Sequence, residues 1–182
     1  MLKKNPQKAD SEIKLETLKS IFDHNYQLIG LADNKATAIL TVNGLMLTVV
    51  IALVGFLGDF FVFESYLDIL AIVFFGLYLI SCLVSLVFSI LTISPLQRTG
   101  IPSPKHVFYY VNILEHKDKE KYHLALSEVL DDYNLIEEGF AEQIFSISVV
   151  NRRKYKFVRL CIWTLLSSFI LVGAFLIILI FN

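Results

Sequence analysis

The sequence contains few of the residues that build catalytic or metal sites. It has two cysteines and four histidines, and no Cys/His spacing of the kind that binds zinc. The patterns GxSxG and HExxH, a Walker loop, a Gly-rich phosphate loop and a DxD pair with metal partners are all missing. We therefore expect no enzyme, no catalytic residue, no metal site and no resident cofactor.

Charge is missing from three long stretches of the chain. Residues 36–58, 69–97 and 160–182 contain no Asp, Glu, Lys or Arg. A helix needs roughly 20 apolar residues to cross a bilayer core, and each stretch is longer than this. The sequence therefore predicts three transmembrane helices.

Basic residues are missing from the connector between the first two stretches. Residues 59–68 carry only acidic charges, and every Lys and Arg lies before the first stretch or between the second and third. The positive-inside rule then places the N-terminus in the cytoplasm and the C-terminus outside. Cys82 and Cys161 would lie at different depths, which argues against a disulfide between them.

Proline is missing from residues 10–57, where apolar residues recur at helical spacing. This predicts one long helix that runs from the cytoplasm into the membrane, and residues 135–181 predict a second. Prolines 95 to 104 predict an irregular link, followed by short amphipathic helices. Because an apolar helix face is stabilised when it is covered, we expect these segments to form a small bundle.

The predicted fold is an all-α membrane protein with three transmembrane helices and a small cytoplasmic helical bundle, formed by an N-terminal helix and a central segment. Its segments are an amphipathic N-terminal helix (1–35), a first span (36–58), an external loop (59–66), a second span (67–94), a cytoplasmic helical segment (95–159) and a third span (160–181). Self-association would cover more apolar surface, so we expect a homo-oligomer. The net charge of −1 gives no sign of binding to a nucleic acid polymer.

Three polar residues near the first span are candidates for a role in the membrane. Asp33 and Lys35 lie at its edge, two residues apart and so on different helix faces. They fit interfacial anchors, and they also fit a gate. Asn43 lies about two turns deeper, where an amide serves as interhelical glue or lines a pore. The sequence leaves these alternatives open.

A basic cluster precedes the third span and includes Arg152, Arg153 and Lys154. Such a cluster is typical of a positive-inside flank near anionic lipid headgroups. Alternatively, these residues, with Lys35, contact a phosphate-bearing ligand, and Tyr109 stacks on its base. All five are candidate ligand-binding residues.

Several short motifs together resemble one family. They are the block ADNKA at 32–36, Pro95, Phe108-Tyr109, Gln143-Ile144 and Lys154-Tyr155. With them the sequence, from about Asn25 to Ser168, resembles the transmembrane effectors of Pycsar, a bacterial pyrimidine-cyclase antiphage system.

The resemblance implies a function. In that family a companion cyclase makes cyclic CMP or cyclic UMP during infection, and the effector impairs the inner membrane so that the cell dies before phage are released. The lipid bilayer and a cyclic pyrimidine nucleotide would then be the partners of this chain. The alternative is a constitutive membrane scaffold that anchors a cytoplasmic partner.

The predicted orientation can be tested by cysteine labelling. A single cysteine placed within residues 115–125 should not react with a membrane-impermeant maleimide added to intact cells, because the positive-inside rule keeps this segment in the cytoplasm. Labelling from outside intact cells would show that the topology is the reverse of the predicted one.

Overall fold

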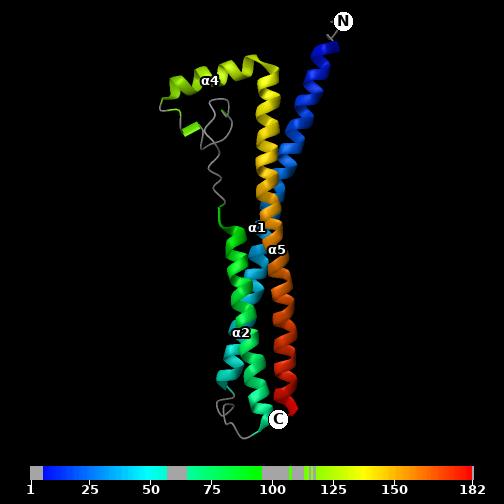
Figure 1. The fold of residues 1–182 in the computed structure, drawn as a ribbon, viewed down its shortest axis with the longest axis vertical. Helices are drawn as coiled ribbons and strands as arrows, with labels where there is room; N and C mark the ends of the chain where they lie inside the picture. Colours follow the sequence, from blue (N-terminus) through cyan, green and yellow to red (C-terminus); the bar gives the residue numbers. More distant parts are fainter. Residues whose placement is uncertain are drawn as a thin grey trace. The chain divides into compact units, whose positions relative to one another are not determined.

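The computed structural model describes residues 6–56, 65–95, 107, 113–114, 116 and 118–181. Within these ranges the chain is almost entirely helical and contains no strand. The helices are α1 (Pro6–Phe56), α2 (Tyr66–Ile93), α4 (Lys119–Asp131) and α5 (Tyr133–Phe181) (Figure 1). The predicted all-α class is therefore confirmed, whereas the predicted irregular link and the helix after Pro104 lie mostly outside the described residues.

The two long helices predicted from the absence of proline are confirmed. Helix α1 has 51 residues and α5 has 49, so each extends for about 75 Å at 1.5 Å per residue. Three helices (α1, α2 and α5) are long and apolar enough to cross a membrane, as predicted. The exact limits of each predicted span stay predictions.

The start of α2 is fixed by a capping box. The Ser65 hydroxyl oxygen accepts a hydrogen bond from the Leu67 amide at 3.3 Å, and the Ser65 amide donates to Asp68 Oδ2 at 2.8 Å. These bonds satisfy amides that have no partner inside the helix, and the carboxylate complements the positive end of the helix dipole. The capping box thus explains why an acid, Asp68, lies in the first turn of an otherwise apolar helix.

The chain divides into two compact units, and α1 and α5 contribute to both. Unit 1 comprises Met1–Ile29 and Leu96–Asn151; unit 2 comprises Gly30–Pro95 and Arg152–Asn182. Two of the three boundaries lie inside the long helices, between Ile29 and Gly30 in α1 and between Asn151 and Arg152 in α5, and the third follows Pro95, after the end of α2.

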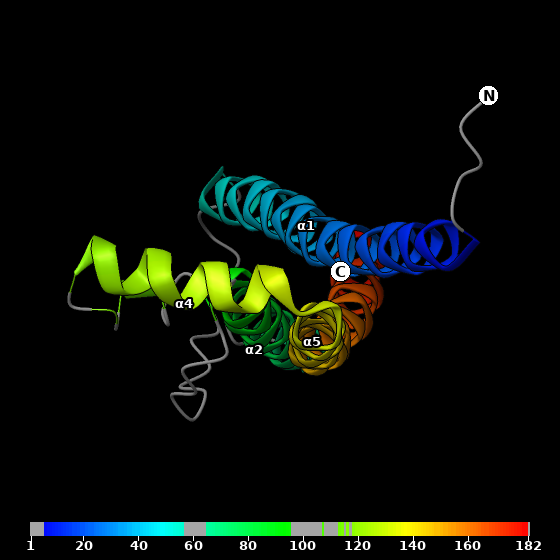
Figure 2. The same cartoon turned by 90° about the horizontal axis from the view of Figure 1, so that it is seen from above.

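In unit 1, α1 and α5 lie side by side and run in the same direction. The Tyr133 hydroxyl donates to the Ser11 carbonyl at 3.2 Å, and the Asn151 amide donates to the Asn25 carbonyl at 2.8 Å. Between these two hydrogen bonds, the rings of Phe22 on α1 and Phe140 on α5 pack edge to face. Both views show α4 lying across the direction of α5, to which it connects at Asp132 (Figures 1 and 2).

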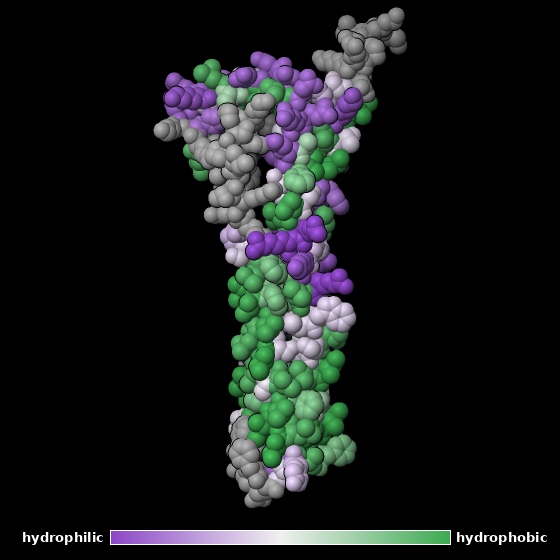
Figure 3. Space-filling model, in the orientation of Figure 1, coloured by the Kyte–Doolittle hydropathy of each residue, from purple (hydrophilic) through white to green (hydrophobic). Residues whose placement is uncertain are grey.

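In unit 2, α2 packs antiparallel to α1 and α5. A shared core contains residues of all three helices, namely Val50, Ala71, Tyr78, Cys82, Val172 and Phe175. The outer surface of these helices is also apolar (Figure 3), with exposed residues such as Leu45, Ile80 and Ile170. Helices that are apolar on every side are typical of a membrane-spanning bundle.

Two substitutions on α5 separate the core of unit 2 from its outer surface. Phe175 is 2% exposed and its ring lies 5.5 Å from that of Phe75, whereas Ile177 is 58% exposed. Phe175→Ala should lower the free energy of unfolding by roughly 3 kcal/mol or more, as in other closely packed cores. Ile177→Ala should have little effect. Unfolding in mixed detergent micelles, followed by circular dichroism, measures both, and equal losses would contradict this packing.

Candidate functional site

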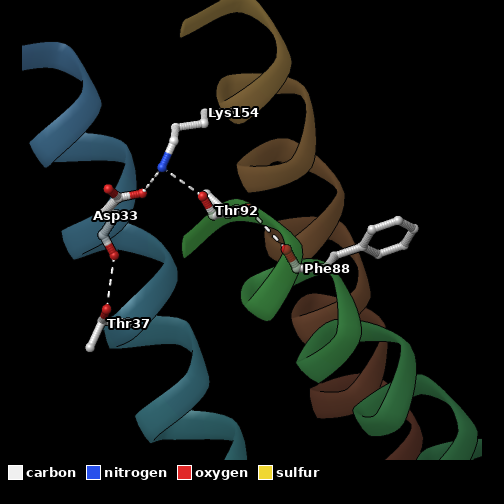
Figure 4. A network of polar contacts seen from close by, with 5 residues as sticks. All are labelled: Asp33, Thr37, Phe88, Thr92 and Lys154. Atoms are coloured by element: carbon white, nitrogen blue, oxygen red, sulfur yellow. Dashed lines mark hydrogen bonds and ion pairs between the residues drawn. The ribbon is translucent and has the colours of Figure 1, made fainter. Parts of the chain in front are cut away.

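Lys154 on α5 is a buried cation that joins three helices. Its side chain is only 4% exposed. The ammonium donates to the Asp33 carboxylate on α1 and to the backbone carbonyl of Thr92 on α2, the latter at 2.8 Å (Figure 4). All three residues belong to unit 2. A single side chain therefore links α1, α2 and α5.

The α1 side of this contact is built for close approach. Ala32 and Ala36 are fully buried on either side of Asp33, and their small side chains let α1 come near its neighbours. The Asp33 side chain is 32% exposed, so its carboxylate faces water on one side and Lys154 on the other. The Asp33 backbone carbonyl accepts a hydrogen bond from the Thr37 hydroxyl at 2.9 Å, whereas the Asp33 carboxylate accepts from Lys154.

The α2 side of the contact lies in the last turn of that helix. Carbonyls at a helix C-terminus have no partner within the helix and carry partial negative charge. Helix α2 has no basic residue of its own in this turn, and Lys154 provides a cation from α5. The Thr92 hydroxyl bonds to the Phe88 carbonyl at 2.9 Å, so only the Thr92 backbone carbonyl faces the lysine.

A series of small polar residues on α2 follows α5 away from Lys154. The Ser81 hydroxyl donates to the Thr164 carbonyl at 2.9 Å, and the Ser85 hydroxyl donates to the Cys161 carbonyl at 3.4 Å. Ser89 lies between Ser85 and Thr92, with its hydroxyl 3.5 Å from the Cys161 sulfur. Small hydroxyl residues bring helices together in lipid, where hydrophobicity alone does not favour association. We call Ser81, Ser85, Ser89 and Thr92 the polar seam.

Asn43 links α1 to α2 deeper in unit 2. Its side chain amide donates to the Cys82 carbonyl at 3.0 Å. The residue is 1% exposed, and its Oδ1 has no hydrogen-bond partner among the described residues. The amide is thus placed between two helices, and a role in gating stays a prediction.

The other predicted site residues lie apart from this contact. Lys35 is exposed, with its ammonium 5.7 Å from the centre of the Tyr155 ring. Arg152 and Arg153 are also exposed, and neither forms an ion pair with a described residue. The predicted basic cluster, which also includes Lys156 and Arg159, therefore contains one buried, paired lysine and four exposed basic residues. Tyr109 lies outside the described residues.

Sequence reasoning named Asp33 and Lys154 separately but missed their pairing and the part of Thr92. One signal was present. Lys154 is in helical phase with the apolar Val158 and Cys161 and with Asn151, and the structure shows that all three are buried. Nothing in the sequence singles out the Thr92 carbonyl, because a backbone acceptor has no signature. Among the described residues, no group of His, Cys, Asp or Glu could hold a metal ion.

Comparison with known proteins places these residues in one family. The family model described as the Pycsar effector protein domain matches residues 17–181, a range that includes every residue of the Lys154 contact and of the polar seam. No curated protein and no solved structure matches the chain.

A double-mutant cycle measures how strongly Lys154 and Asp33 depend on each other. Asp33→Asn alone leaves the buried Lys154 ammonium without its anionic partner and should cost roughly 3–5 kcal/mol of stability. Lys154→Met alone leaves a carboxylate that is 32% exposed and should cost less, because that charge can be hydrated. The double variant leaves no charge there and should cost clearly less than the sum of the two. Unfolding of the purified protein in mixed micelles gives all three values.

Lys156→Met is the matched control for this cycle. Lys156 lies on the same helix but is exposed, so its substitution should change the free energy of unfolding by less than about 0.5 kcal/mol. If the loss of stability in the double variant equals the sum of the losses in the two single variants, the interaction between Lys154 and Asp33 contributes nothing to stability.

Proposed function

The chain belongs to the Pycsar effector family, and from this premise we propose that a cyclic pyrimidine nucleotide, cyclic CMP or cyclic UMP, activates it to impair the bacterial inner membrane. The family places it in antiphage defence. The observation that carries the proposal is the extent of the match, which includes all of α2 and the apolar parts of α1 and α5. Death of the infected cell before phage release would be the outcome.

The membrane location follows from the same helices. Three apolar helices and membership of a transmembrane effector family make this a multi-pass membrane protein. We propose the inner membrane, with the N-terminus in the cytoplasm and the C-terminus outside, because of the distribution of basic residues. Unit 1 and the start of the unit 2 segments, where Lys35, Arg152 and Arg153 lie, would then be on the cytosolic side, where a nucleotide made by a companion cyclase can reach them.

The chemistry of the ligand limits which side chains can hold it. A cyclic nucleotide carries one negative phosphodiester and one base, which suit a guanidinium and an aromatic ring. Lys154 already has two acceptors, which favours the exposed Lys35, Arg152 and Arg153 as phosphodiester partners. Stacking of the base on Tyr109 stays a prediction.

The transmission of the signal would use α1 and α5. Each is one uninterrupted helix that contributes to both units. A rotation of the helix segment in unit 1 would therefore also rotate the segment in unit 2, which we place in the membrane. Three helices from one chain make a poor pathway through a bilayer, and we propose that several copies assemble. The nucleotide would drive the change by binding the active arrangement more tightly than the resting one.

Dye leakage from liposomes tests this function. Purified protein in liposomes that contain a self-quenched dye should release it when cyclic CMP or cyclic UMP is added, and not with cyclic AMP. Binding is measured in the same preparation by calorimetry. A preparation that binds a cyclic pyrimidine nucleotide and releases no dye would overturn the proposal and favour the scaffold alternative.

Asn43→Leu separates insertion from opening. The substitution removes the hydrogen bond to the Cys82 carbonyl but keeps the segment apolar, so we expect full membrane insertion and a loss of stability of about 1 kcal/mol. Membrane fractionation and unfolding in micelles measure the two. If the variant assembles normally and still kills cells on signalling, Asn43 takes no part in opening.

A further inference from the structure

We propose that Lys154 is the positioning residue that holds unit 2 in a resting, non-leaking arrangement, and that its contacts with Asp33 and the Thr92 carbonyl must open before the membrane is impaired. This inference rests on the proposed function and adds to it the contact on which regulation acts.

The first argument is the burial of the charge. The charge on a lysine side chain that is only 4% exposed is costly unless acceptors surround it. Its acceptors come from two different helices, α1 and α2. Withdrawal of either helix leaves the lysine short of a partner, so intermediate separations are disfavoured. The contact is therefore either made or broken, as a switch requires.

The second argument is that the Lys154 ammonium can be solvated once its contacts with Asp33 and Thr92 are broken. Successive residues of a helix point about 100° apart. Arg153, one residue before Lys154, is exposed. A rotation of α5 by about one residue would therefore bring the Lys154 ammonium to a position where water or lipid phosphates accept its hydrogen bonds. Asp33, which is 32% exposed, would stay hydrated.

The third argument is the place of the contact along the helices. Within unit 2 the α1 segment begins at Gly30 and the α5 segment at Arg152, so Asp33 and Lys154 both lie in the first turn after the boundary. A movement carried along either helix from unit 1 would reach this contact before the serines of the polar seam.

The test is leakage in the absence of any nucleotide. Lys154→Met keeps most of the side-chain volume but removes the charge, and should raise spontaneous dye release from liposomes at least about tenfold over wild type. Lys156→Met, which removes an exposed lysine two residues away, should match wild type. Asp33→Asn provides a second variant if Lys154→Met does not fold, and should also raise release.

A third variant separates loss of the resting state from general instability. Phe175→Ala weakens the core of unit 2 without touching Lys154, and should not leak. Leakage by Phe175→Ala equal to that of Lys154→Met would overturn the inference, as would a folded Lys154→Met protein that stays as tight as wild type. Wild-type protein that never leaks with nucleotide would instead reject the proposed function, whatever the variants do.

Discussion

The rest of unit 2 depends on one constraint: a lysine charge placed at the end of an apolar helix bundle must find acceptors there. An ammonium without partners in such surroundings costs far more than any single packing contact provides. The Lys154 contacts with Asp33 and Thr92 meet that need with a side chain from α1 and a backbone group from α2. This requirement holds α5 in the rotation that turns Lys154 toward α1 and α2.

The polar seam is the second consequence of building a bundle in lipid. The outside of α2 is formed by large aliphatic residues such as Ile80 and Val87, whereas Ser85 and Ser89 face α5 and are fully buried. In a water-soluble protein, the aliphatic residues would be buried and the serines would face the solvent. In a bilayer, hydrophobicity does not distinguish the inside of the bundle from the outside, and close approach with interhelical hydrogen bonds does. The same reasoning explains why Asn43 is buried between α1 and α2.

The fold could be predicted from the sequence because it depends on absences. Missing charge marked the three spans, and missing proline marked the long helices that became α1 and α5. The contact at Lys154 could not be predicted, because rotation of a helix decides which of Arg152, Arg153 and Lys154 turns inward. Asn151, Val158 and Cys161 lie at helical spacing from Lys154, but their burial is known only from the structure. The pairing of Lys154 with Asp33, 121 positions earlier in the chain, needed the packing of α1 against α5.

A buried pair that fixes the resting state also bears on why several copies would act together. To move a two-state protein from 1% to 99% active, a signal must favour the active state by about 10⁴-fold, or about 5.5 kcal/mol. A single site for a small cyclic nucleotide would have to supply all of this. If several copies switch together, each binding site supplies part of this preference. With four sites, binding to the active state that is about tenfold tighter at each site suffices. A firmly held resting state therefore favours an assembled effector over a monomer.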